Sequence, residues 1–276
     1  MYGAIIGDIV GSKYEFFNIK TKNFPLFSPG CDYTDDSIMT VAAAKALLRA
    51  HNEEAPDLFR IFTEEMRALG QAYPDPMGAY GTRFIGWLFT DDPAPYNSCG
   101  NGSAMRVSPC ALYAQTLEEA LFLAEASAVI THNHPEGIKG AKATAAAIFL
   151  AKTGSSKDEI AAYIRQHFYP LAKTLAEIRP SYSFDGTCQG TVPEALTAFL
   201  ASTSFEDSIR NAISIGGDSD TIGAITGSVA YSYYRRAGED LSAYRKKAEA
   251  YLPKEFVTVI EEFERVCVER NGESNK

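Results

Sequence analysis

The chain has 276 residues, of which 46% are hydrophobic and 22% are charged, as is ordinary for a globular protein. Its formal net charge of -9 and pI near 5.1 argue against binding to nucleic acid or to a membrane surface, because phosphate groups repel an acidic protein that lacks a basic stripe. No apolar stretch reaches the ~20 residues that a membrane-spanning helix needs, and the N-terminal apolar run lacks the basic flank of a signal peptide. Five scattered cysteines without a C-x-x-C pair fit a reducing compartment, so we expect a cytoplasmic protein.

Helical periodicity dominates the chain from one end to the other. Apolar residues recur at helical spacing over 36–50, 57–69, 117–131, 136–152, 157–168, 192–202, 205–214, 221–235 and 254–269. Alternating β-branched runs are scarce, so we expect an all-α fold, a compact bundle of about ten or more helices. Segment 137–151 is rich in glycine and alanine, which predicts a central buried helix. No linker divides the chain, so we expect one domain over residues 1–270 and a frayed, disordered tail over 271–276.

Two acidic clusters, far apart in the sequence, each open an apolar helix. They are Thr34-Asp35-Asp36-Ser37 and Asp218-Ser219-Asp220-Thr221, the second preceded by two glycines. Either cluster alone is explained as a helix cap, since carboxylates and hydroxyls bind the free N–H groups of a first turn. If folding brings both together, however, the carboxylates repel one another unless cations neutralise them. An all-oxygen ligand set suits magnesium, calcium or manganese rather than zinc, so the pair predicts a divalent-cation site.

Two further segments carry polar side chains among glycines. Near the N-terminus, Gly7, Asp8, Gly11 and Ser12 lead to Glu15, and this spacing is equally typical of close helix packing with a surface carboxylate. Farther on, the loop Gly100-Asn101-Gly102-Ser103 precedes a predicted helix. Its backbone N–H groups and the Ser103 hydroxyl could hold a phosphate or diphosphate, although Gly-Asn-Gly is also common turn chemistry.

His132 and His134 precede the small-residue helix. The chain has only four histidines and no cysteine beside this pair, which argues against a zinc site. A hydrogen-bonding role in a substrate cleft and simple helix capping both remain open. No G-x-S-x-G motif occurs, which argues against acyl transfer through a serine.

Taken in order, these motifs resemble the ADP-ribosylglycohydrolase family, metal-dependent hydrolases that remove ADP-ribose from modified targets. The resemblance spans nearly the whole chain. The matching segments are Gly3 to Asp8 with Gly11 and Glu15, Thr34-Asp35-Asp36, Gly100-Asn101-Gly102 through Met105-Arg106, Thr131-His132, and Gly216 to Thr221. The chain departs from the family pattern at Ser37, where threonine is more usual, and at Tyr231 and Ser232.

The resemblance implies an all-α fold with two magnesium ions, or manganese ions, in a cleft. The metal ligands that it implies are Thr34, Asp35 and Asp36 on one side, Asp218, Asp220 and Thr221 on the other, and Glu15 from a loop. The substrate-binding residues that it implies are Gly100, Asn101, Gly102 and Ser103 at the diphosphate or adjoining ribose, His132 beside the substrate, and Tyr80 and Gly81 along the cleft. The expected catalytic carboxylate is Glu15 or Asp36.

The expected reaction is metal-dependent hydrolysis of the glycosidic bond between ADP-ribose and an acceptor. The acceptor, whether arginine, serine, another side chain or a small conjugate, is not specified by the sequence. The expected partner is therefore an ADP-ribosylated protein or a small ADP-ribose conjugate, and the expected state is a monomer. Two alternatives stay open: a non-catalytic structural relative with stabilising cation sites, and a magnesium-dependent phosphoester hydrolase acting on a nucleotide.

Overall fold

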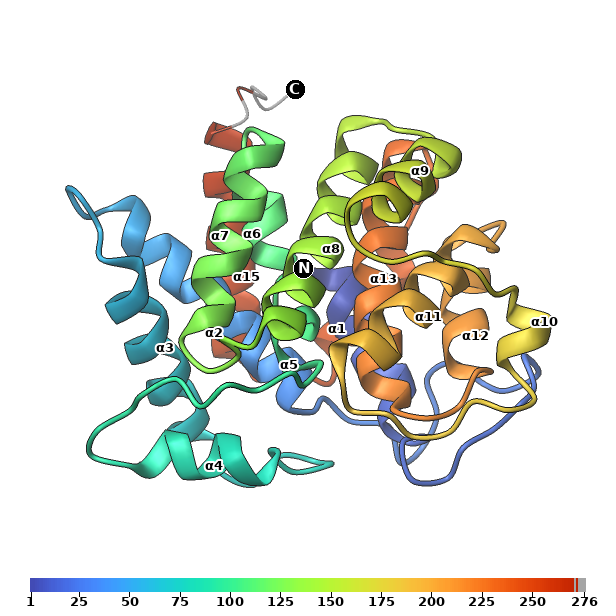
Figure 1. The fold of residues 1–276 in the computed structure, drawn as a ribbon, viewed down its shortest axis with the longest axis horizontal. Helices are drawn as coiled ribbons and strands as arrows, with labels where there is room; N and C mark the ends of the chain where they lie inside the picture. The colour runs from blue at the N-terminus through green and yellow to red at the C-terminus, as the bar shows by residue number, and fades with distance from the viewer. Residues whose placement is uncertain (271, 273–276) are drawn as a thin grey trace.

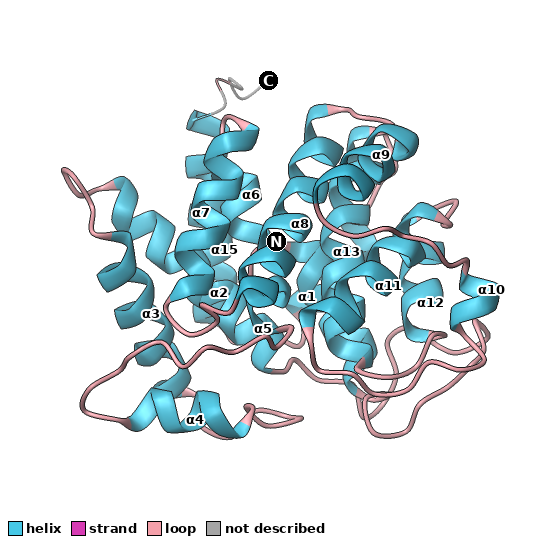
Figure 2. Cartoon of the chain, viewed as in Figure 1, coloured by secondary structure: helices cyan, strands magenta, loops and turns pink. Residues whose placement is uncertain are grey.

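The computed structural model describes residues 1–270 and 272, and these form helices packed around a shared hydrophobic core (Figure 1). The all-α prediction is confirmed, since the described part of the chain contains no strand and only two isolated β-bridges (Figure 2). The helices are α1 Tyr2–Ser12, α2 Asp35–His51, α3 Leu58–Ala72, α4 Thr82–Phe89, α5 Gly102–Met105, α6 Ser108–Tyr113, α7 Leu117–Val129, α8 Pro135–Thr153, α9 Lys157–His167, α10 Leu175–Ile178, α11 Cys188–Leu200, α12 Phe205–Ile213, α13 Ser219–Arg236, α14 Ser242–Glu249 and α15 Lys254–Arg270. Apart from Gly272, the tail predicted over 271–276 lies outside the described residues.

Every segment with helical periodicity forms a helix whose ends differ from the prediction by a few residues. α11 begins at Cys188 rather than at 192, because the Thr187 side chain accepts a hydrogen bond from the Gly190 N–H and caps the helix there. The spacing of apolar residues did not predict α1, and the reason is physical. All of its residues are buried, so it has no polar face to mark a helical period. No helix of the described residues has the length and hydropathy needed to cross a membrane.

α1 and α13 pack with their backbones in direct contact. A Cβ atom added to the α1 glycines would overlap carbonyl oxygens of α13, so only glycine allows this approach. The added Cβ would lie 2.1 Å from the Gly227 oxygen for Gly3, 1.9 Å from the Gly223 oxygen for Gly7, and 2.4 Å from the Ser219 oxygen for Gly11. The pairing is antiparallel, so the end of α1 lies beside the start of α13. The segment that follows α1 is thereby brought to the second acidic cluster.

Asp8 joins α1 to α2. Its buried carboxylate accepts hydrogen bonds from the Thr34 N–H at 3.1 Å, the Thr34 hydroxyl at 2.7 Å and the Ser37 N–H at 3.1 Å, and also from the Ser37 hydroxyl. Burial raises the pKa of Asp8 to about 6, although these hydrogen bonds favour its charged form. Asp8 therefore fixes the first turn of α2, and with it the first acidic cluster, against α1.

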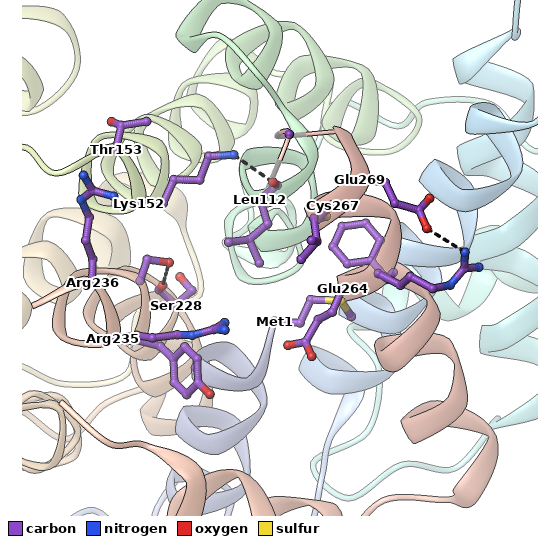
Figure 3. A pocket seen from close by; sticks show the side chains of 17 residues that line it. Met1, Leu112, Lys152, Thr153, Ser228, Arg235, Arg236, Glu264, Cys267 and Glu269 are labelled. Carbon is purple, nitrogen blue, oxygen red and sulfur yellow. Dashed lines mark hydrogen bonds and ion pairs between the residues drawn. The ribbon is translucent and has the colours of Figure 1, made fainter. Parts of the chain in front are cut away.

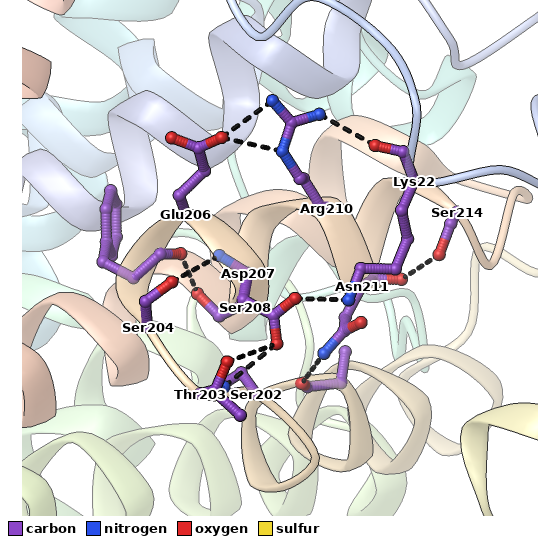
Figure 4. A network of polar contacts seen from close by, with 12 residues as sticks. Lys22, Ser202, Thr203, Ser204, Glu206, Asp207, Ser208, Arg210, Asn211 and Ser214 are labelled. Carbon is purple, nitrogen blue, oxygen red and sulfur yellow. Dashed lines mark hydrogen bonds and ion pairs between the residues drawn. The ribbon is translucent and has the colours of Figure 1, made fainter.

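The long loop between α1 and α2 is anchored on α12 (Figure 4). The Arg210 guanidinium donates hydrogen bonds to the carbonyl oxygens of Lys22 at 2.8 Å and Phe24 at 2.7 Å, and Lys22 forms an ion pair with Asp207. These contacts tie the middle of the loop to the body of the protein. The loop then returns to Thr34 at the start of α2.

Candidate active site

The two acidic clusters meet in one cleft with a volume of about 540 Å³. Residues from widely separated parts of the sequence line it. The predicted residues among them are Glu15, Asp35, Asp36, Tyr80, Gly81, Gly100, Asn101, Gly102, His132, Asp218, Asp220 and Thr221. Folding therefore brings together most of the residues that the sequence singled out. Thr34 and Ser103 do not line the cleft.

Carboxylate oxygens without hydrogen-bond partners converge in this cleft. Oxygen atoms of Glu15, Asp218 and Asp220 all lie within 4.8 Å of one another. Across the cleft, the Thr221 hydroxyl donates to Asp36 Oδ2 at 3.2 Å and links the two clusters. Three buried carboxylate oxygens of the cleft have no hydrogen-bond partner among the described residues: Glu15 Oε2, Asp36 Oδ1 and Asp220 Oδ1. Unpaired buried carboxylate oxygens are rare, and this set fits a hard divalent cation.

The electrostatics of the cluster point the same way. Burial, reinforced by repulsion from Asp218 and Asp8, raises the pKa of Glu15 to about 8. Burial and the neighbouring carboxylates also hold the pKa of Asp36 and of Asp220 well above the usual range. Without cations, the site can hold its carboxylates only by keeping protons on some of them. A divalent cation would remove that need.

Hydrogen bonds within the protein engage the side chains of three predicted residues, Thr34, Ser103 and Asn101. The Thr34 hydroxyl donates to Asp8 and accepts from the Asp36 N–H at 3.2 Å. The Ser103 hydroxyl donates to the carbonyl oxygen of Gly137 at 2.7 Å, and the residue is fully buried. Asn101 lines the cleft, but its amide donates to Asp218 Oδ2 at 2.7 Å. Its side chain therefore orients a carboxylate of the cluster.

Asn18 was missed by the sequence analysis. Its amide nitrogen donates to the carbonyl oxygens of Tyr14 at 2.7 Å, Glu15 at 2.8 Å and Gly217 at 2.9 Å, and its Oδ1 accepts from the Gly217 N–H at 2.7 Å. Asn18 thus clamps the Glu15 loop to the turn that precedes Asp218. No local pattern in the sequence marks it. Asp8 belongs to a matching motif but has no predicted role. The sequence signal for its structural role is that it is a lone acid within an apolar run.

The two histidines have different surroundings. The His134 side chain accepts a hydrogen bond from the Glu136 N–H at 3.1 Å and caps α8. His132 lines the cleft, and its Nδ1 lies 2.7 Å from the Thr131 hydroxyl. Helix capping therefore accounts for His134, while His132 faces the space that a substrate would enter.

A second, larger cavity of about 1200 Å³ lies near the C-terminal ends of α13 and α15 (Figure 3). None of the described residues that line it also lines the acidic cleft. Its acids are paired with arginines: Glu264 lies 2.9 Å from Arg245, and Glu269 lies 3.0 Å from Arg265. Among the residues that the structure describes, the lining of this cavity therefore holds no unpaired carboxylate of the kind found in the smaller cleft.

Comparison with known proteins agrees with this geometry. The family model described as ADP-ribosylglycohydrolase matches residues 1–238. The chain belongs to the ADP-ribosylglycohydrolase family. This membership supports a hydrolase that acts on ADP-ribose linkages.

Relatives in the family come from distant organisms. The human protein named ADP-ribosylhydrolase ARH3 is 26% identical over 310 residues, covering 84% of this chain and 83% of its own. The Serratia proteamaculans protein named ADP-ribosylarginine hydrolase Tri1 is 22% identical over 271 residues, covering 85% of this chain and 70% of its own. A solved structure described as an ADP-ribosylglycohydrolase-related protein complex superposes with a TM-score of 0.67 at 24% identity, covering 99% of this chain and 95% of that one. That likeness shows a shared fold.

Proposed function

We propose that this protein is a metal-dependent hydrolase that cleaves the glycosidic bond between ADP-ribose and an acceptor, and that it uses two Mg²⁺ or Mn²⁺ ions. The acceptor is a protein side chain or a small conjugate. The observation that carries the proposal is the convergence of unpartnered carboxylate oxygens from Glu15, Asp36 and Asp220 in one cleft. Family membership supplies the substrate class. We also propose that the protein acts as a monomer in the cytoplasm.

The donor set fits hard cations from both sides of the cleft. Asp35 and Asp36 would bind from the start of α2, and Asp218, Asp220 and Thr221 from the start of α13. Thr34 donates one hydrogen bond and accepts another, so its hydroxyl oxygen retains one lone pair for a ligand. Bound cations would supply charge neutralisation and Lewis-acid polarisation.

Glu15 is the carboxylate best placed to handle a proton. Its Oε2 has no partner among the described residues, and Glu15 lies on the cleft wall in the loop that follows α1. Asp36, the second candidate, already receives the Thr221 hydroxyl on one oxygen. We therefore assign Glu15 as the base that accepts the proton of the attacking water. Negative charge from the cluster also stabilises the oxocarbenium-like transition state of glycosidic cleavage.

The remaining cleft residues would bind the substrate. Gly100 and Gly102 present backbone to the cleft beside His132, and they leave room that a larger residue would fill. Tyr80 and Gly81 line the wall beside α4, where the Tyr80 hydroxyl donates to the Tyr73 carbonyl at 2.9 Å and so fixes its ring. We propose that these residues hold the diphosphate and riboses while the acidic cluster holds the reacting end.

The test is release of free ADP-ribose from arginine-linked, serine-linked and small-molecule conjugates. Each substrate is assayed with Mg²⁺, with Mn²⁺ and with a chelator. The Asp220→Asn variant removes one unpartnered oxygen and should abolish turnover while the fold, followed by circular dichroism, is retained. Asp91→Asn changes an exposed acid outside the cleft and serves as the matched control.

Chelator-sensitive release of ADP-ribose that is lost in D220N and retained in D91N would support the proposal and identify the acceptor. Release of inorganic phosphate with an intact glycosidic bond would replace it with a phosphoester hydrolase. Bound metal without release from any conjugate would leave a structural relative with cation sites.

A further inference from the structure

A buried chain of hydrogen bonds links Arg106 and Thr131 to His132, which lines the cleft. Arg106 follows α5, and its side chain is only 1% exposed. Its Nη2 donates to the Ser127 carbonyl oxygen and to the Thr131 hydroxyl oxygen, both at 2.8 Å. No carboxylate within the described ranges forms an ion pair with it. Arg106 is thus a fixed cation and donor beneath the wall that holds His132.

The direction of the hydrogen bonds in this chain follows from the chemistry of the three groups. A guanidinium can only donate, so the Thr131 oxygen is the acceptor from Arg106. The Thr131 hydroxyl is fully buried, and its other contact is His132 Nδ1 at 2.7 Å. Its single proton therefore points to Nδ1, which must accept. A neutral imidazole whose Nδ1 accepts carries its proton on Nε2.

The opposite tautomer, with the proton on Nδ1, leaves a hydrogen-bond donor without an acceptor. If Nδ1 carried a proton, it would donate to Thr131, and the threonine proton would have no acceptor among the residues described. A ring protonated on both nitrogens would in addition place a positively charged imidazolium beside the Arg106 cation. Burial, together with Arg106 and Arg83, holds the pKa of His132 well below its usual range. The ring is accordingly neutral.

The Nε2 atom faces the cleft. A Cβ atom added to Gly100 or to Gly102 would lie 3.3 or 3.2 Å from Nε2, so these glycines leave the nitrogen accessible. No acceptor for Nε2 occurs in the part of the chain that the structure describes, whereas Nδ1 is satisfied from behind. The N–H is therefore directed at a ligand.

We propose that Arg106 and Thr131 are positioning residues that lock His132 as the Nε2–H tautomer, which makes it a permanent hydrogen-bond donor to an oxygen of the bound substrate. In this arrangement His132 neither takes up nor releases a proton during turnover. The kinetic consequence rests on the proposed function. The tautomer itself does not, since it is a property of the free protein.

The first arm of the test is a long-range ¹H–¹⁵N spectrum of the uniformly ¹⁵N-labelled protein. Only four histidines contribute, and a His132→Phe variant assigns the ring. We expect an unprotonated Nδ1 and a protonated Nε2. A protonated Nδ1 of His132 in the wild-type protein would overturn the proposal, and the variant serves only to assign the His132 signals.

The second arm compares Thr131→Val with Thr131→Ser. T131V keeps the shape but removes the hydroxyl, so the tautomers should mix, whereas T131S should restore the wild-type pattern. With an ADP-ribose conjugate as substrate, T131V should raise KM about tenfold with little change in kcat or in the pH profile. An unchanged spectrum in T131V would overturn the role of Thr131. If no conjugate is turned over, the proposed function fails while the spectra still decide the tautomer.

Discussion

Replacement of Gly7 by alanine tests how the acidic site is assembled. The added Cβ would lie 1.9 Å from the Gly223 carbonyl oxygen, whereas ordinary contact begins at 3.4 Å, so α1 and α13 must part by about 1.5 Å. Overpacking of this kind costs about 1–3 kcal/mol, and the upper end applies because the obstructing atoms are backbone. The helix preference for alanine returns about 1 kcal/mol. We expect a net loss of about 2 kcal/mol and weaker metal binding, since Glu15 moves away from Asp218.

The assay is thermal unfolding by calorimetry, with Mg²⁺ titration of the folded variant. A loss of about 2 kcal/mol should lower Tm by about 4–8 °C in a chain of this size. Gly86→Ala is the matched control, because Gly86 lies in α4 with no atom within 4 Å of its added Cβ. That variant should be unchanged or slightly more stable. Equal Tm values for G7A and the wild type would refute the close-packing argument.

Three further predictions concern the cleft. In chelator, Tm should fall as pH rises from about 5 to 8, because a carboxyl group whose pKa is raised by folding, such as Glu15 at about 8, stabilises the protein only while protonated. Mg²⁺ should therefore raise Tm more at pH 8 than at pH 5.5, and equal shifts would argue against a cation site at these carboxylates. Asn18→Ala should weaken Mg²⁺ binding about tenfold, as measured by calorimetry, while the exposed Asn52→Ala should not. Equal Mg²⁺ affinities of N18A and the wild type would show that the hydrogen bonds of Asn18 do not support the metal site. Glu15→Gln should lower kcat about 10²–10⁴-fold in the ADP-ribose release assay, and retention of full activity would exclude it as the base.

The sequence alone predicted the helices that have one polar face, and it predicted that a helix begins at each of the two acidic clusters. Both are local properties. The period of apolar residues records which face of a helix is buried, and Thr34 caps α2 through a contact with the N–H of Asp36, two residues away. The resemblance to a family added the expectation that the clusters meet, and the structure places both on one cleft.

Only the tertiary structure determined which polar groups have hydrogen-bond partners within the protein and which remain available to a ligand. α1 has no polar face, so its helical state depends on burial against α13. The Ser103 hydroxyl and the Asn101 amide have partners distant in the sequence, which no local pattern encodes. The hydrogen bonds of Asn18 to the turn at Gly217, and of Arg106 to Thr131, likewise join segments that meet only after the chain has packed. Glu15 Oε2, Asp36 Oδ1 and Asp220 Oδ1 are among the buried atoms that packing leaves without a hydrogen-bond partner, and no local pattern encodes that outcome.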